Sequence, residues 1–185
     1  MTNAPELWIP LLASGLTAAA AICDLRTGLI PNRLVAWGAG ATLLLTLALA
    51  YPHGTFAMVR ALTSLALGLV MVSLIPVLLY RMDGLGGGDV KLLAVVGAAL
   101  GPYAGLEAEM YAFACALLYA PMRLLWEGKL RQSLRTAARV FLRPLLPRSR
   151  QLHEPTAETM TAFRFGPAIF LGTLTSVVLR VVATH

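Results

Sequence analysis

The sequence contains few charged residues for its length of 185. Charged side chains make up 13% of it and hydrophobic side chains 58%, with a mean hydropathy of +0.73. A typical soluble domain is about 25% charged and about 45–50% apolar. The apolar residues also occur in long blocks, and a helix needs about 20 of them to cross a membrane. The composition therefore indicates a polytopic membrane protein rather than a soluble domain.

Cysteine is scarce, and the common catalytic motifs are missing. Cys23 and Cys115 are far apart in separate apolar blocks, and no CxxC pair occurs, so two small buried side chains are a simpler interpretation than a disulfide or a zinc site. The segment 86–91 matches neither GxGxxG nor GxxxxGK[ST], and no HExxH or GxSxG motif occurs. The three histidines (His53, His153 and His185) are not grouped. We therefore expect no metal and no cofactor.

The apolar blocks predict six transmembrane helices and no strand. Only helices and closed barrels satisfy all backbone polar groups in lipid, and no alternating pattern supports a barrel. A basic segment is missing before the first block, where Glu6 is the only charge, so this block is predicted to be a permanent span rather than a signal peptide. The loops leave no room for a second domain, so residues 1–185 are predicted to form a single transmembrane domain. The blocks lie at about 7–23, 34–51, 56–80, 90–101, 104–126 and 164–183.

The distribution of basic residues predicts the orientation. Six spans place both termini on one side, and with the termini outside, the inner loops are 24–33, 81–89 and 127–163. Of the fifteen lysines and arginines, all but Arg60 and Arg180 then lie in or beside the inner loops, as the positive-inside rule requires. Three acidic residues fall on the outer side: Glu6, Glu107 and Glu109.

The inner loop 127–163 contains a basic amphipathic segment. Arginines recur there every four residues, which places them on one face of a helix, with apolar residues on another face. Such a helix lies at the membrane interface and binds anionic head groups, and we favour this partner over nucleic acid or another protein. The four basic residues are Arg131, Arg135, Arg139 and Arg143.

Two aspartates, Asp24 and Asp89, lie at the inner ends of predicted helices. Ionisable groups at membrane depth are rare and usually functional. Taken singly, Asp24 could be a solvated loop residue, and Asp89 could cap the helix that begins at Val90. Taken together, two neighbouring carboxylates share a proton, so that one can accept a proton from water while the other polarises a carbonyl. The pair thus predicts acid–base peptide hydrolysis.

The residues around Asp89 have possible roles in the same site. Gly86, Gly87 and Gly88 carry no side chain and would let an extended substrate backbone approach closely. Lys91 could act on the carboxylates through its charge, or extend its ammonium group to the membrane surface. Asp83 is interpreted as a solvated loop residue, and Pro31 and Asn32 as the turn into the second helix.

Three segments resemble those of the type IV prepilin peptidases. "GGGDVKLLAVVGAALG" (86–101) is similar to the GxGD motif of that family, with Gly86, Gly88 and Asp89 at the motif positions. "DLRTGLIPNRL" (24–34) is similar to the segment with the first aspartate. "RFGPAIFLG" (164–172) resembles the start of the last helix, although Arg164 stands where proline is common.

The resemblance implies an aspartyl protease of the bacterial inner membrane with Asp24 and Asp89 as the catalytic pair. Such proteins cleave the leader from prepilins or pseudopilins on the cytoplasmic side, and the short chain resembles the peptidases of Flp/Tad-type pili. The CxxC insert of larger members is missing, so the resemblance does not extend to their methyltransferase activity. Two alternatives are a non-catalytic transporter or pilus-assembly subunit, and a related peptidase for preflagellin-like substrates.

Overall fold

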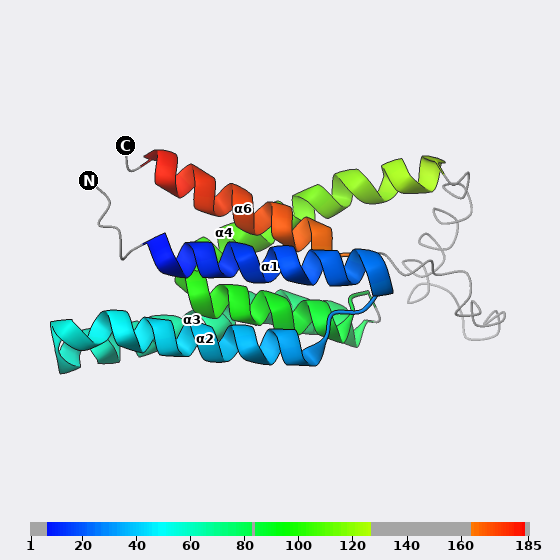
Figure 1. The fold of residues 1–185 in the computed structure, drawn as a ribbon. Coiled ribbons are helices and arrows are strands. Elements are labelled where there is room, and N and C mark those ends of the chain that lie inside the picture. Colours follow the sequence, from blue (N-terminus) through cyan, green and yellow to red (C-terminus); the bar gives the residue numbers. More distant parts are fainter. Residues whose placement is uncertain (1–6, 83, 127–163, 184–185) are drawn as a thin grey trace, which may run out of the picture. The chain divides into compact units, whose positions relative to one another are not determined.

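The computed structural model describes residues 7–82, 84–126 and 164–183, and all regular elements in these ranges are helical (Figure 1). Five of the helices are long and apolar enough to cross a membrane. The predicted all-α polytopic membrane protein is confirmed. In chain order, the elements are α1 (Trp8–Thr27), α2 (Asn32–Ala50), the 3-10 helix η2 (Tyr51–His53), α3 (Thr55–Arg81), α4 (Gly87–Trp126) and α6 (Gly166–Ala183).

Helix α4 contains a sharp break, so it corresponds to two of the six predicted segments. Gly101 interrupts it with φ 79° and ψ 176°, a left-handed φ that glycine adopts without a steric penalty. The chain then folds back on itself, as Figure 1 shows: a Cβ atom on Gly105 would lie 2.8 Å from the Cα of Gly97. The two arms match the predicted blocks 90–101 and 104–126.

Contacts within the chain divide it into two units. The first comprises residues 1–115 and 164–185, and the second residues 116–163. Of the second unit, the structure describes the end of α4, residues 116–126. The single domain predicted from the sequence stays a prediction, as does the basic helix with its four arginines, which lies outside the described residues.

Small residues bring the helices of the first unit close together. A Cβ atom on Gly68 of α3 would lie 2.1 Å from the carbonyl oxygen of Gly97 in α4. A Cβ atom on Gly172 of α6 would lie 2.4 Å from the backbone nitrogen of Ala112 in α4. Small residues at such positions let helix backbones pack directly in a membrane. Helix α1 packs against both α2 and α6.

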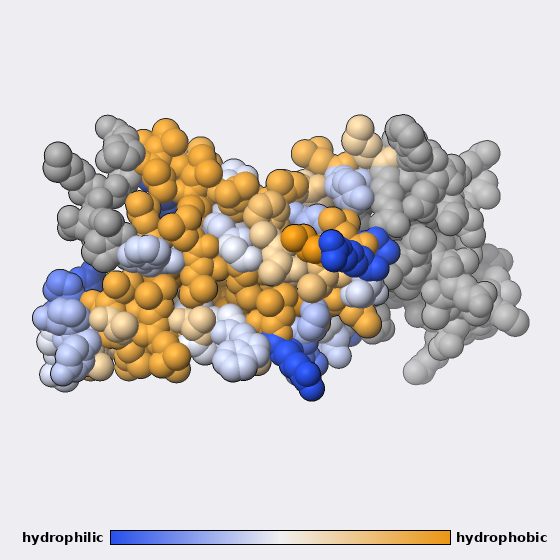
Figure 2. Space-filling model, in the orientation of Figure 1, coloured by the Kyte–Doolittle hydropathy of each residue, from blue (hydrophilic) through white to orange (hydrophobic). Residues whose placement is uncertain are grey.

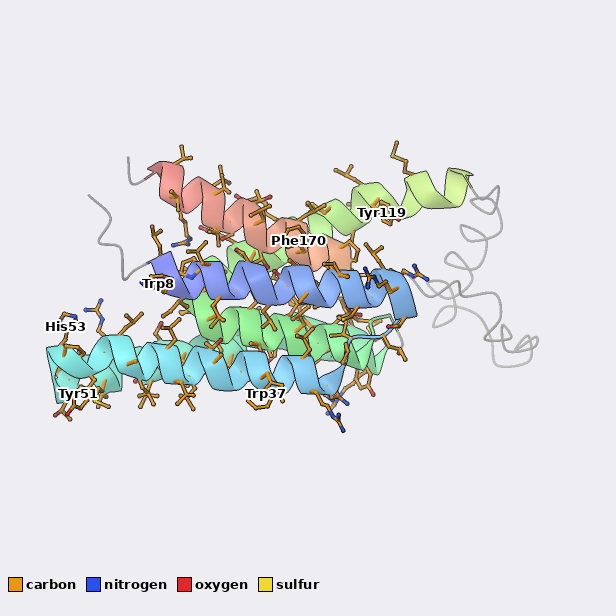
Figure 3. The ribbon with its side chains drawn as sticks, in the orientation of Figure 1. Trp8, Trp37, Tyr51, His53, Tyr119 and Phe170 are labelled. Atoms are coloured by element: carbon orange, nitrogen blue, oxygen red, sulfur yellow. The ribbon has the colours of Figure 1, made fainter. Side chains whose placement is uncertain are left out.

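The outward faces of the helices are apolar. Figure 2 shows hydrophobic side chains over much of the visible surface, and α3 exposes Phe56, Leu74 and Leu78. Trp37 of α2 extends away from the helices, with 78% of its surface exposed (Figure 3). Soluble monomers rarely expose apolar patches of such extent, so these faces fit a lipid environment.

Three acidic residues lie in surroundings that the sequence did not predict. Helix α1 continues to Thr27, so Asp24 is part of its last turn rather than of a loop. Helix α4 begins at Gly87 rather than at Val90, so Asp89 lies inside its first turn. Glu109, which we had grouped with the charges on the outer side, is buried, with 2% of its surface exposed.

Candidate active site

Asp24 is a buried residue near the end of α1. Its exposed fraction is 5%, so its interpretation as a solvated loop residue is wrong. The helix ends at Gly28, whose left-handed conformation (φ 69°) lets its N–H donate to the carbonyl oxygen of Asp24 at 2.8 Å. This glycine-terminated ending is a common way to stop a helix. The backbone that carries Asp24 is therefore fixed by a local hydrogen bond.

The carboxyl group of Asp24 is bound by the start of α6. The backbone N–H of Gly166 donates to Oδ2 of Asp24 at 2.9 Å. Two residues earlier, the Arg164 guanidinium donates to the carbonyl oxygen of Leu25. The segment 164–172 resembles a family motif, but its sequence did not predict these contacts. Nearly all buried polar groups have a hydrogen-bond partner, so the burial of Asp24 requires a donor. The sequence does not show which residue supplies this donor.

Asp89 is the third residue of α4 and interacts with the backbone just before this helix. Its carboxyl group forms a hydrogen bond with the backbone of Gly86. An acidic side chain at the third helical position commonly reaches back in this way to the residue that precedes the helix. Asp89 therefore caps α4 from inside the first turn, and its prediction as the residue before the helix was wrong.

The two aspartates lie near each other although they come from different helices. Asp24 on α1 and Asp89 on α4 are close enough for their carboxylates to repel each other electrostatically. Two like charges in a partly buried site are unfavourable, and a proton held by one of them removes the repulsion. Such an arrangement can pair an acid with a base.

Comparison with protein families identifies the family of the chain. A model of the type IV leader peptidase family matches residues 6–121, which is more than half of the 185-residue chain. The chain belongs to this family. The matched range contains Asp24 and Asp89 and ends before the segment 164–172. Searches of curated proteins and of solved structures found no match.

The three glycines of this leader peptidase before Asp89 allow close packing within the molecule. A Cβ atom on Gly86 would lie 2.8 Å from Oδ2 of Asp89, so a side chain there would displace the carboxyl group. A Cβ atom on Gly88 would lie 3.1 Å from the Cβ of Ile30, in the link between α1 and α2. On Gly87 it would meet the ring of Tyr80 at 3.4 Å. Close approach of a substrate to these glycines stays a prediction.

Lys91 of the peptidase links two helices. Its Nζ donates to Oδ1 of Asn32 at 2.9 Å, which joins the fifth residue of α4 to the first residue of α2. Pro31 precedes α2, and its carbonyl oxygen accepts from the N–H of Leu34 at 3.0 Å. Pro31 thus forms part of the turn, as predicted, while the bond of Asn32 to Lys91 was not predicted. Asp83 lies outside the described residues, and Cys23 and Cys115 are free thiols.

Proposed function

We propose that this peptidase is a membrane-embedded aspartyl endopeptidase that removes the leader peptide from type IV prepilins or pseudopilins of the Flp type. The observation that carries the proposal is the proximity of Asp24 and Asp89, two carboxyls from separate helices. The membership in a leader peptidase family supports the reaction class.

The proposed mechanism uses one ionised and one protonated aspartate. The ionised carboxylate takes a proton from a water molecule, and the resulting hydroxide attacks the carbonyl carbon of the scissile peptide bond. The protonated carboxyl donates a hydrogen bond to the carbonyl oxygen and stabilises the charge that develops there. Transfer of a proton to the leaving nitrogen then breaks the C–N bond. One water molecule is consumed, and no covalent intermediate forms.

In the proposed orientation, the pair faces the cytoplasm and both termini lie outside, in the inner membrane of a bacterium. The distribution of lysine and arginine supports this orientation. A leader on the cytoplasmic side could then reach the pair while the apolar stem of the prepilin remains in the lipid.

The test is cleavage of a defined substrate by the full-length protein. The purified peptidase in detergent would be incubated with full-length prepilins from its own organism, and the products identified by mass spectrometry. We expect a single cut just before the apolar stem. The Asp24→Asn/Asp89→Asn double variant, purified in parallel, is the control for contaminating proteases. A folded wild-type protein that cleaves none of these prepilins would contradict the proposal.

Anionic lipid is the second partner that we propose, through Arg131, Arg135, Arg139 and Arg143. Each cation near an anionic surface contributes about 1 kcal/mol, and less as salt increases. The segment 127–163 should therefore resist added protease more on liposomes with anionic lipid than on neutral ones. Replacing all four arginines should remove this difference and affect cleavage less than loss of either aspartate. Equal protection on both liposomes, with cleavage lost in the quadruple variant, would instead assign the arginines to the active site.

A further inference from the structure

Three consecutive residues before and at the start of α6 contact two other helices, α1 and α4. The Arg164 guanidinium donates to the Leu25 carbonyl oxygen at the end of α1. The ring of Phe165 packs on the ring of Phe113 in α4, with 5.4 Å between the ring centroids. The N–H of Gly166 donates to Asp24. The start of α6 is thus held in place by both helices around it.

These contacts complement the polarity of both helix ends. The last carbonyl groups of a helix lack intrahelical donors, and its first N–H groups lack acceptors. The Arg164 cation lies at the C-terminal end of α1, and the Asp24 carboxyl lies at the N-terminal end of α6. Both arrangements are favourable for the helix dipoles. These two contacts therefore stabilise the end of α1 and the start of α6.

Residue 166 leaves no room for a side chain. A Cβ atom there would lie 2.8 Å from both the Cβ and Oδ2 of Asp24. Atoms this close cannot coexist without a shift. Since Asp24 is buried and its backbone is fixed by Gly28, the added atom would change the position of the Asp24 carboxyl group relative to the start of α6.

We propose that Gly166 is a positioning residue, whose backbone N–H fixes Oδ2 of Asp24 and leaves Oδ1 to act on water or substrate. This inference rests on the proposed function of Asp24. Among the described residues, none donates a hydrogen bond to Oδ1 of Asp24, whereas Oδ2 is occupied by Gly166. The first turn of α6 is therefore part of the catalytic arrangement, although it contributes no side chain to it.

The most direct test removes the donor and adds no atoms. Replacing Gly166 by glycolic acid, which turns the amide N–H into an ester oxygen, should lower kcat for prepilin cleavage about tenfold or more. KM should stay within about threefold of wild type, because the substrate-binding surface is unchanged. A variant with an unchanged kcat would overturn the proposal.

A matched pair of alanine substitutions separates positioning from packing. Gly166→Ala should lower kcat by about 100-fold, because it displaces the carboxyl that must act as acid or base. Gly172→Ala, in the same helix, should lower thermal stability more, since its Cβ would lie 2.4 Å from backbone nitrogen in α4. Its kcat per folded molecule should nevertheless stay within about threefold of wild type. Equal losses of kcat in the two variants would reduce Gly166 to a packing role.

A spectroscopic measurement separates this inference from the proposed function. The infrared difference between each protein and its Asp24→Asn counterpart isolates the carboxyl band of Asp24. This band should shift in the ester variant and stay unchanged in Gly172→Ala. An unshifted band would disprove the hydrogen bond whatever the activity. If the band shifts in the ester variant but the wild-type protein cleaves no prepilin, the hydrogen bond is supported and only the proposed function is rejected.

Discussion

Asp24 and Glu109 are both acidic residues buried among the helices, but their surroundings differ. Asp24 is 5% exposed and accepts a hydrogen bond from Gly166 at 2.9 Å. Glu109, in the second arm of α4, is 2% exposed, and neither of its carboxyl oxygens has a hydrogen-bond partner among the described residues. Within the described part of the chain, the more deeply buried acid is therefore the one that has no hydrogen-bond partner.

The difference shows that burial alone does not identify a functional acid. A polar group buried without a partner destabilises the fold, whereas a buried carboxyl that another helix binds is held in one orientation. Asp24 also lies near a second carboxyl, Asp89. If the proposed pair is the reaction centre, changes to Asp24 and Asp89 should affect cleavage, whereas changes to Glu109, which has no hydrogen-bond partner among the described residues, should affect stability.

Cleavage should distinguish the two acids most strongly. Asp24→Asn and Asp89→Asn should each lower kcat by about 1000-fold or more, because an amide keeps the shape of the carboxyl but cannot accept and return a proton. Glu109→Gln should stay within about threefold of wild type, and Asp83→Asn should retain most of the activity. The measurement is the rate of leader removal in detergent. A loss in Glu109→Gln as large as in Asp24→Asn would break the comparison.

Replacing the same two acids by leucine should change the stability of the protein in opposite directions. Glu109→Leu removes a buried group without a partner and should stabilise the protein by about 1–2 kcal/mol. Asp24→Leu leaves the N–H of Gly166 without its acceptor and should destabilise it by about 1–3 kcal/mol. The melting temperatures of both variants in the same detergent give the comparison. A lower melting temperature for Glu109→Leu would indicate that Glu109 has a partner outside the described residues.

The link between Lys91 and Asn32 should have an intermediate effect. Lys91→Met and Asn32→Ala should each lower kcat about three- to tenfold, because either change frees the start of α4, where Asp89 lies, from α2. The double variant should be no worse than the more affected single variant, as expected for two partners in one interaction. If Lys91 acted on the carboxylates through its charge, Lys91→Met would lower kcat further in the Asn32→Ala background.

Glu107, an exposed acid, should matter least. Glu107 accepts from Arg180 at 2.8 Å, and both side chains are about half exposed. Exposed ion pairs contribute about 1 kcal/mol or less, so Glu107→Gln should change the stability by no more than that and leave cleavage intact. The effect should shrink further in high salt. A larger loss of stability, unchanged by salt, would show that this pair holds α4 and α6 together.

Much of the fold and the identity of the candidate acids could be predicted from the sequence. The apolar blocks predicted the helices, and the division between the blocks 90–101 and 104–126 predicted the break that divides α4 into two arms. The sequence also placed Asp24 and Asp89 at corresponding helix ends, and their action as a catalytic pair stays a prediction. The helix ends were less accurate, because Asp24 and Asp89 are polar and were read as lying outside the helices that contain them.

The sequence by itself determined that this chain is a helical membrane protein, because hydrophobicity and length are properties of the residues alone. It also singled out Asp24 and Asp89 as the carboxyls that we propose to react. Only the tertiary structure decided how Asp24 is held, since its donor is a backbone N–H that lies 142 residues away and that every residue except proline possesses. Tertiary structure likewise decided that Glu109 is buried while Glu107, two residues earlier, is exposed and paired. Which side of a helix faces its neighbours depends on close contacts such as that between Gly97 and Gly105, and these form only when the arms of α4 pack together.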